Sequence, residues 1–255
     1  MPQITKPNKI VHSKHFRERT KPIEYIIIHC STQSPKEQLK VLDELGLSVH
    51  YIIGKDGTVI QNLPPEKVAF HAGLSKWKDS KEKSLNDVSI GIELESANMG
   101  QKKGDFSRST MFRLNILLKE LCYKYKIRKE NILGHSDIAP TRKPDPGAGF
   151  EWHKLYRNKL VIWYGLASLH QETDERKLLK IIGYDTKSLV AARYAFCRHF
   201  YPEEVRVVKN IQKLLDNPYP KTFKPKDNEK YLRVLRATAF AIEKERKKRY
   251  WYLEK

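Results

Sequence analysis

Two short, strongly apolar runs place the tightest limits on how this chain can fold. Ile23–Ile28 is rich in β-branched residues and leads into His29, and Val88–Leu94 is a second apolar run that ends among the acids Glu93 and Glu95. Apolar runs of this length and composition are typical of buried strands. Each run also carries polar side chains to the end of its strand, which indicates a functional site there as well as a core.

The segments between these two runs predict the start of a mixed sheet with helices against it. Residues 34–45 place apolar side chains at helical spacing, and Gly46 then supplies a helix stop. Residues 49–53 and 58–61 are β-rich and are joined by the turn Lys55-Asp56-Gly57, in which Asp-Gly favours a tight hairpin. We therefore expect an α/β fold with a mixed central β-sheet flanked by helices.

Two further patterns follow the second apolar run. Apolar residues recur at helical spacing from Met111 to Tyr125, after a cap at Ser107 or Ser109, and predict one long amphipathic helix. The segment 134–150 contains three prolines and three glycines, so we expect an extended loop that carries polar side chains. Loops of this kind often hold functional residues.

The character of the chain changes beyond about Leu169, where glycine becomes scarce and helical patterns cover 174–182, 186–200, 203–216 and 228–250. These patterns predict a domain boundary near residues 165–175, which divides the chain into residues 1–170 and a smaller all-α domain, residues 171–255. Phe196, Phe200 and Tyr201 lie at helical spacing and favour a core role over a sugar platform. The basic run 244–249 favours a solvated helix face.

Bulk properties exclude several classes of protein. No apolar run approaches the roughly 20 residues needed to cross a bilayer, and no secretory signal follows the basic N-terminus. Cys30, Cys122 and Cys197 are odd in number and widely spaced, so we expect free thiols. The net charge of +19 suggests nucleic-acid binding, but the excess is spread over both halves of the chain without a concentrated basic face. We therefore expect no nucleic-acid partner.

Three residues form a possible metal-binding set. Catalytic zinc takes three protein ligands and keeps one position open for water, and His29, His135 and Asp145 could supply such a set from one strand end and one loop. Taken singly, each histidine is more often structural, and Asp145 could be a simple turn former in its Pro-Asp-Pro-Gly sequence.

The ordered motifs of the chain decide between these alternatives. IIIHCS, VHYIIGKDGTVIQ, AFHAG, LNDVSIGIELE and GHSDIAPTRKPDPG occur between Ile23 and Trp163. Together they resemble the type-2 N-acetylmuramoyl-L-alanine amidase family, which includes AmpD-like and AmiD-like amidases and the peptidoglycan recognition proteins. The resemblance implies one zinc ion per chain, bound by His29, His135 and Asp145, and hydrolysis of the amide between N-acetylmuramic acid, or its anhydro form, and L-alanine.

The resemblance also implies roles for further residues. Glu93 matches the catalytic glutamate of the family, and a carboxylate beside zinc can move the proton of the attacking water. Lys143 matches a lysine two residues before the last ligand, where it could stabilise the oxyanion. His50 and His71 also lie in family motifs, where they could line the substrate groove or support the ligands. A strand would place Glu95 on the same face as Glu93, so its role is left open.

Peptidoglycan or muropeptides are thus the expected partners, with a non-catalytic peptidoglycan-recognition module as the alternative. The tail LLKIIGYDTKSLVAARYAFCRHFYP looks like the helical peptidoglycan-binding module of AmiD-type amidases. We expect residues 1–170 to cut small muropeptides alone.

The sequence as given predicts a cytoplasmic protein, or a periplasmic or outer-membrane-associated one if a leader was removed.

Overall fold

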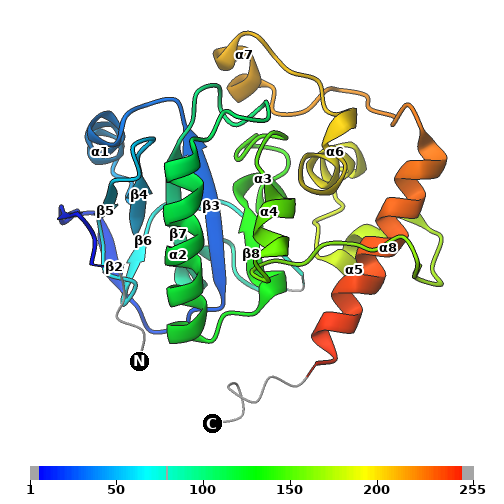
Figure 1. Ribbon diagram of the computed structural model, residues 1–255, viewed down its shortest axis with the longest axis horizontal. Coiled ribbons are helices and arrows are strands. Elements are labelled where there is room, and N and C mark those ends of the chain that lie inside the picture. The colour runs from blue at the N-terminus through cyan, green and yellow to red at the C-terminus, as the bar shows by residue number, and fades with distance from the viewer. Residues whose placement is uncertain (1–5, 79, 249–255) are drawn as a thin grey trace.

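A six-stranded mixed sheet forms the centre of the protein (Figure 1). The computed structural model describes residues 6–78 and 80–248. The sheet has the strand order β1-β5-β4-β7-β3-β8, and β2 and β6 form a separate antiparallel pair. The strands are β1 (Lys9–Ile10), β2 (Phe16–Glu18), β3 (Tyr25–Ser31), β4 (Tyr51–Ile53), β5 (Val59–Gln61), β6 (Lys67–Ala69), β7 (Ser89–Glu95) and β8 (Ile132–Gly134).

The parallel strands bring the ends of β3, β7 and β8 together. β3 lies between β7 and β8 and runs parallel to both. In this register His29 lies opposite Glu93, and Ile28 lies opposite Gly134 at the end of β8. Because parallel strands finish at the same edge of a sheet, the polar residues that follow each strand meet there.

The two faces of β3 pack against different parts of the chain. Ile26 and Ile28 join the hydrophobic cluster with Leu114 and Leu118 of α2 (Arg108–Tyr125). Residues on the opposite face, Tyr25 and Ile27, join a cluster that extends into the C-terminal helices. Since alternate residues of a strand share a face, His29 lies on the face of Tyr25 and Ile27, away from α2.

The local signals in residues 34–125 give the expected elements. α1 (Pro35–Glu44) begins at Ser34, whose side chain forms a capping box with Glu37. β4 and β5 pair antiparallel across the predicted turn, and Ser107 is the side chain that caps α2. The mixed sheet with flanking helices is therefore confirmed.

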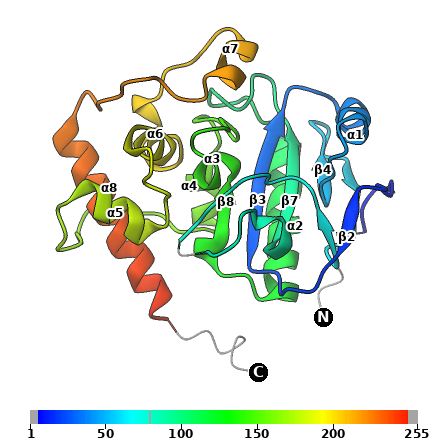
Figure 2. The same cartoon turned by 180° about the vertical axis from the view of Figure 1, so that it is seen from behind.

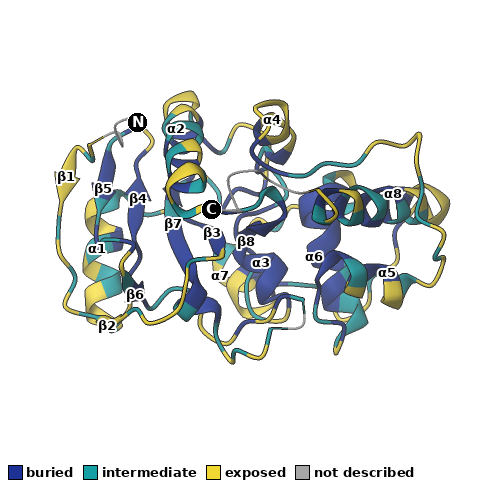
Figure 3. Ribbon diagram, turned by 90° about the horizontal axis from the view of Figure 1, so that it is seen from below, coloured by how far each residue is buried: buried dark blue, intermediate teal, exposed yellow. Residues whose placement is uncertain are grey.

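The C-terminal helices lie beside the β8 edge of the sheet (Figures 1 and 2). They are α5 (Glu175–Ile182), α6 (Leu189–Phe200), α7 (Ile211–Asp216) and α8 (Asn228–Arg246). One hydrophobic cluster joins Ile27 and Leu133 of the sheet to Leu178, Phe196 and Leu235 of these helices. The helices and the sheet thus share a core, and in Figure 3 the burial continues from β3 and β8 into α6.

Two expected segments differ from the structure in their secondary structure. The segment 134–150 begins with a short helix, α3 (His135–Ile138), before it becomes a loop, because the Asp137 side chain accepts a hydrogen bond from the Gly134 amide and closes the turn. The predicted helix 203–216 is divided into a 3-10 turn, Pro202–Glu204, and α7. Sequence periodicity does not reveal such a break.

Other expectations concern single side chains and the end of α8. Phe196, Phe200 and Tyr201 are buried in the core as expected, and all three cysteines are free. The basic run is only partly a solvated face, because the partly buried Arg246 donates to the carbonyls of Ile181 and Ile182. Residues 249 and 250 lie outside the described residues. Within 6–78 and 80–248, no helix is long and apolar enough to cross a membrane.

Candidate metal centre and amidase site

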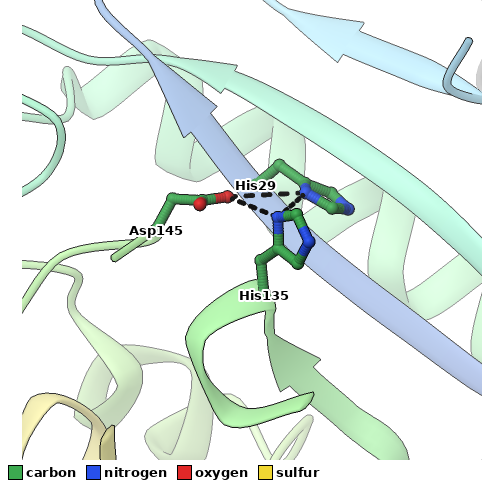
Figure 4. A group of neighbouring side chains, drawn as sticks. All are labelled: His29, His135 and Asp145. Carbon is green, nitrogen blue, oxygen red and sulfur yellow. Dashed lines mark hydrogen bonds and ion pairs between the residues drawn. The ribbon is translucent and has the colours of Figure 1, made fainter. Parts of the chain in front are cut away.

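Three buried side chains converge at the edge where β3 and β8 end (Figure 4). His29 lies near the end of β3, His135 opens α3 directly after β8, and Asp145 lies in the loop that follows. His29 Nδ1 and His135 Nδ1 are 2.9 Å apart. Asp145 Oδ2 lies 3.1 Å from His135 Nδ1 and 3.4 Å from His29 Nδ1. The structure thus brings together the three ligands expected from the sequence.

A chain of hydrogen bonds fixes the tautomer of His29. The Ser89 hydroxyl donates to the Leu85 carbonyl at 2.6 Å, so its oxygen accepts from His71 Nε2 at 3.2 Å. His71 Nδ1 is then an acceptor, and His29 Nε2 donates to it at 2.9 Å. His29 therefore presents the lone pair of Nδ1 to the centre, with His71 as the supporting partner that metal-binding histidines usually have.

A hydrogen bond to the backbone also orients the ring of His135. His135 Nε2 lies 3.2 Å from the Ala72 carbonyl, which can only accept, so Nε2 carries a proton, and in the neutral ring Nδ1 therefore presents its lone pair. The Ser136 amide donates to the Asp145 carbonyl at 2.7 Å and joins α3 to the loop that carries the third ligand. Three atoms with lone pairs thus face one point, an arrangement that requires a cation or a shared proton between them. The donor set of two imidazoles and one carboxylate fits zinc.

Burial and charge give this set the ionisation that a metal requires. Burial, reinforced by His135, lowers the pKa of His29 to about 4, so His29 is neutral at neutral pH. Burial alone would raise the pKa of Asp145, but His135 and His29 outweigh it and hold that pKa well below its ordinary value. A neutral His29 and an ionised Asp145 bind a cation without first losing protons.

Glu93 lies beside the ligands on the neighbouring strand. Its Oε2 atom is buried and has no hydrogen-bond partner among the described residues. Burial, reinforced by the nearby charge of Asp145, raises the pKa of Glu93 to about 8, although the charge of Lys143 opposes the shift. A carboxylate whose pKa lies near neutrality is well suited to accept and return a proton.

Lys143 and Glu95 differ in their relation to the centre. Lys143 lies on the loop of Asp145, and its charge limits the rise in the pKa of Glu93 and adds to the lowering of the pKa of His29. Glu95, which the sequence left open, accepts from the Lys55 amide at 3.0 Å and so supports the turn between β4 and β5.

The two additional histidines have separate positions. His71 is partly buried and contacts the ligand His29, as described above. His50 is 0% exposed; its Nδ1 accepts from the Gly91 amide, and its Nε2 lies 3.1 Å from the Lys67 carbonyl. The enclosure of the His50 ring by these backbone groups favours the supporting role that the sequence left open over a place in the substrate groove.

Sequence reasoning missed two supporting residues, Ser89 and Asp137. Both residues lie inside the motifs that the sequence analysis quotes, so the sequence could have marked them as candidates. Their partners were not, because Ser89 acts through His71 and Asp137 contacts the distant His199 and Tyr184.

Comparisons with known proteins agree with this fold and site. The family described as N-acetylmuramoyl-L-alanine amidase matches residues 19–148. The N-acetylmuramoyl-L-alanine amidase AmiD of Escherichia coli K12 is 32% identical over 211 residues, which cover 71% of this chain and 75% of AmiD. The 1,6-anhydro-N-acetylmuramyl-L-alanine amidase AmpD of Enterobacter cloacae is 39% identical over 112 residues, 44% of this chain and 57% of AmpD.

A solved structure extends the similarity to the C-terminal helices. The E. coli AmiD structure, a complex with the substrate anhydro-N-acetylmuramic acid-L-Ala-D-gamma-Glu-L-Lys, has a TM-score of 0.66 at 27% identity and covers 91% of this chain and 98% of that one. The chain belongs to the N-acetylmuramoyl-L-alanine amidase family. Within that family it is an AmpD/AmiD-like amidase, an enzyme and not a non-catalytic recognition module.

Proposed function

We propose that this amidase is zinc-dependent and hydrolyses the amide between N-acetylmuramic acid, or its 1,6-anhydro form, and the L-alanine of the stem peptide. The observation that carries the proposal is the convergence of His29 Nδ1, His135 Nδ1 and Asp145 Oδ2, with each Nε2 already bonded elsewhere. The names of the relatives AmiD and AmpD support the choice of bond, and the anhydro sugar occurs both in the name of AmpD and in the substrate bound to E. coli AmiD.

In this proposal the chain's own groups divide the work. His29, His135 and Asp145 hold the zinc, which when bound supplies a Lewis acid that polarises the carbonyl and lowers the pKa of water. Glu93 accepts the proton of the attacking water on its unpaired Oε2 and returns it to the departing L-alanine nitrogen. Lys143 places a positive charge where the oxyanion of the tetrahedral intermediate forms.

Zinc content tests the ligand assignment. We expect about one zinc per purified chain, and far less in His135→Ala, because losing one of three ligands removes most of the affinity. His153→Ala is the matched control, since His153 is an exposed histidine on α4 (Trp152–Arg157). A His135→Ala protein that retains a full equivalent of zinc would refute the site.

A further inference from the structure

A buried carboxylate on the ligand helix is held by residues of the C-terminal helices. Asp137 follows His135 by two residues on α3 and is 1% exposed. Its Oδ2 accepts from the Gly134 amide at 2.7 Å and lies 2.8 Å from His199 Nδ1. Its Oδ1 accepts from the Tyr184 hydroxyl at 2.7 Å. Two of the three donors therefore come from the part of the chain after residue 170.

The His199 ring is stacked against two aromatic rings. It stacks on Trp152, with ring centres 3.8 Å apart and an angle of 13° between the rings. Its other neighbour is Phe200, at 4.0 Å and 9°. Trp152 also lies close to Gly134, the residue before the ligand His135, since a Cβ at Gly134 would be 3.4 Å from the Trp152 ring.

Tyr184 is equally suited to donate. Burial and the adjacent Asp137 hold the pKa of Tyr184 well above its ordinary value, so its hydroxyl remains protonated. Tyr184 is 3% exposed and makes an edge contact with Trp77, at 4.9 Å between ring centres. Trp77 lies in the segment between β6 and β7, so Tyr184 is also held by a residue outside the C-terminal helices.

These contacts matter because α3 has only four residues. A helix this short has almost no stability of its own, so its position depends on what holds it. A buried carboxyl group needs hydrogen-bond partners for its oxygens, and removing one of those partners is costly. The donors of Asp137 therefore determine where α3, and with it His135, lies relative to His29.

We infer that Asp137, His199 and Tyr184 form an anchor, called here the Asp137 anchor, through which the C-terminal helices position the metal ligand His135. His199 and Tyr184 are positioning residues of the amidase site, although they contact none of its three ligands. The inference rests on the proposed metal site, and it makes the C-terminal helices part of the machinery of amide hydrolysis.

Two substitutions of His199 in the full-length chain separate its hydrogen bond from its stacking. His199→Phe keeps a flat ring between Trp152 and Phe200 but removes the donor to Asp137. His199→Asn keeps an N–H near the position of Nδ1 but removes the ring. We expect the zinc dissociation constant, measured by competition with a chelator, to rise about 10- to 100-fold in His199→Phe. In His199→Asn we expect lower thermal stability with a zinc affinity close to that of the parent.

A pair of tyrosine variants provides a milder test with a matched control. Tyr184→Phe removes one hydroxyl bonded to Asp137. Tyr231→Phe removes a similar hydroxyl from the same core, since Tyr231 is 1% exposed and donates to Glu175 at 2.7 Å, away from α3. Both should lower stability, but only Tyr184→Phe should weaken zinc binding.

Hydrogen exchange in the metal-free protein shows how firmly α3 is held in place, and the measurement requires neither bound metal nor turnover. We expect faster exchange in residues 134–139 of His199→Phe and Tyr184→Phe, with no change in β7. If both variants match Tyr231→Phe in exchange and in zinc affinity, the inference is overturned. If the parent protein binds no zinc, the proposed function is wrong. The exchange rates of residues 134–139 would still show whether the Asp137 anchor holds α3 in place.

Discussion

The side chains on one face of β7 have different tasks although they share one strand. Ser89 supports His71, Gly91 leaves room for the His71 ring, Glu93 lies beside His29, and Glu95 supports a turn. The opposite face of the strand, with Ile90, Ile92 and Leu94, is core. Because side chains alternate between the two faces of this seven-residue strand, the residues near the site lie on one face and the core residues lie on the other.

Glu93 and Lys143 should affect turnover more than metal binding, because neither belongs to the ligand set. We expect Glu93→Gln to lower kcat by about 10²- to 10⁴-fold and Lys143→Ala to lower it by about 10²- to 10³-fold. Zinc content should remain near one per chain in both. Turnover within a few-fold of the parent, measured on folded and zinc-loaded protein, would contradict these roles.

The raised pKa of Glu93 also has a consequence for stability. The folded-state pKa of about 8 lies above the ordinary value of 4.5. At a pH between 4.5 and 8, Glu93 is therefore ionised in the unfolded chain but keeps its proton in the folded chain. In the metal-free protein the Glu93 contribution should therefore become more destabilising as pH rises from 5 to 8. Glu93→Gln should be the more stable protein at pH 8, and the difference should shrink at pH 5. Thermal unfolding at the two pH values checks this, and a difference independent of pH would contradict it.

The sequence could predict the side chains of the centre but not their supports. His29, Glu93, His135 and Asp145 stand at strand ends or in a loop, and the order of the motifs singles them out. His50 stands in a similar motif, yet its ring is buried by backbone groups that no sequence pattern reveals. His199 lies 62 residues from Asp137 in the chain, so only the fold brings the two together.

Gly91 shows how one strand position controls the support of a ligand. A Cβ at residue 91 would lie 2.5 Å from His71 Cγ, so Gly91→Ala must displace the ring that accepts from His29. We expect a loss of about 1–3 kcal/mol in stability and about 10-fold weaker zinc binding. Gly165→Ala is the control, since a Cβ there meets nothing within 4 Å. Equal zinc affinities in the two variants would show that His71 does not support the site.

Elements with strong local signals were predictable, whereas elements set by tertiary contacts were not. The hairpin of β4 and β5 and the caps of α1 and α2 follow from residues close in sequence. The turn of α3 depends on the Asp137 side chain, and the break before α7 leaves Val208 bonded to Gln101, 107 residues away. Periodicity within a segment cannot report a partner at that distance.

The shared core changes the expectation for a chain cut after residue 170. The boundary itself remains a prediction, but Ile27, Trp77 and Leu133 pack in one cluster with α5, α6 and α8. Truncation would expose this surface and remove both long-range donors of Asp137. We now expect residues 1–170 to unfold at a lower temperature than the full chain and to bind zinc more weakly. A truncated protein with the stability and turnover of the full chain on a soluble muropeptide would contradict this.

Zinc titration of the metal-stripped full-length protein tests the account most directly. The measured quantity is the rate at which the stem peptide is released from a soluble muropeptide, followed by mass spectrometry as zinc is added. We predict no release without zinc, a rise that saturates at about one zinc per chain, and cleavage only at the bond to L-alanine. Release that persists after the metal is removed, or none at any zinc concentration, would contradict a zinc amidase built on His29, His135 and Asp145.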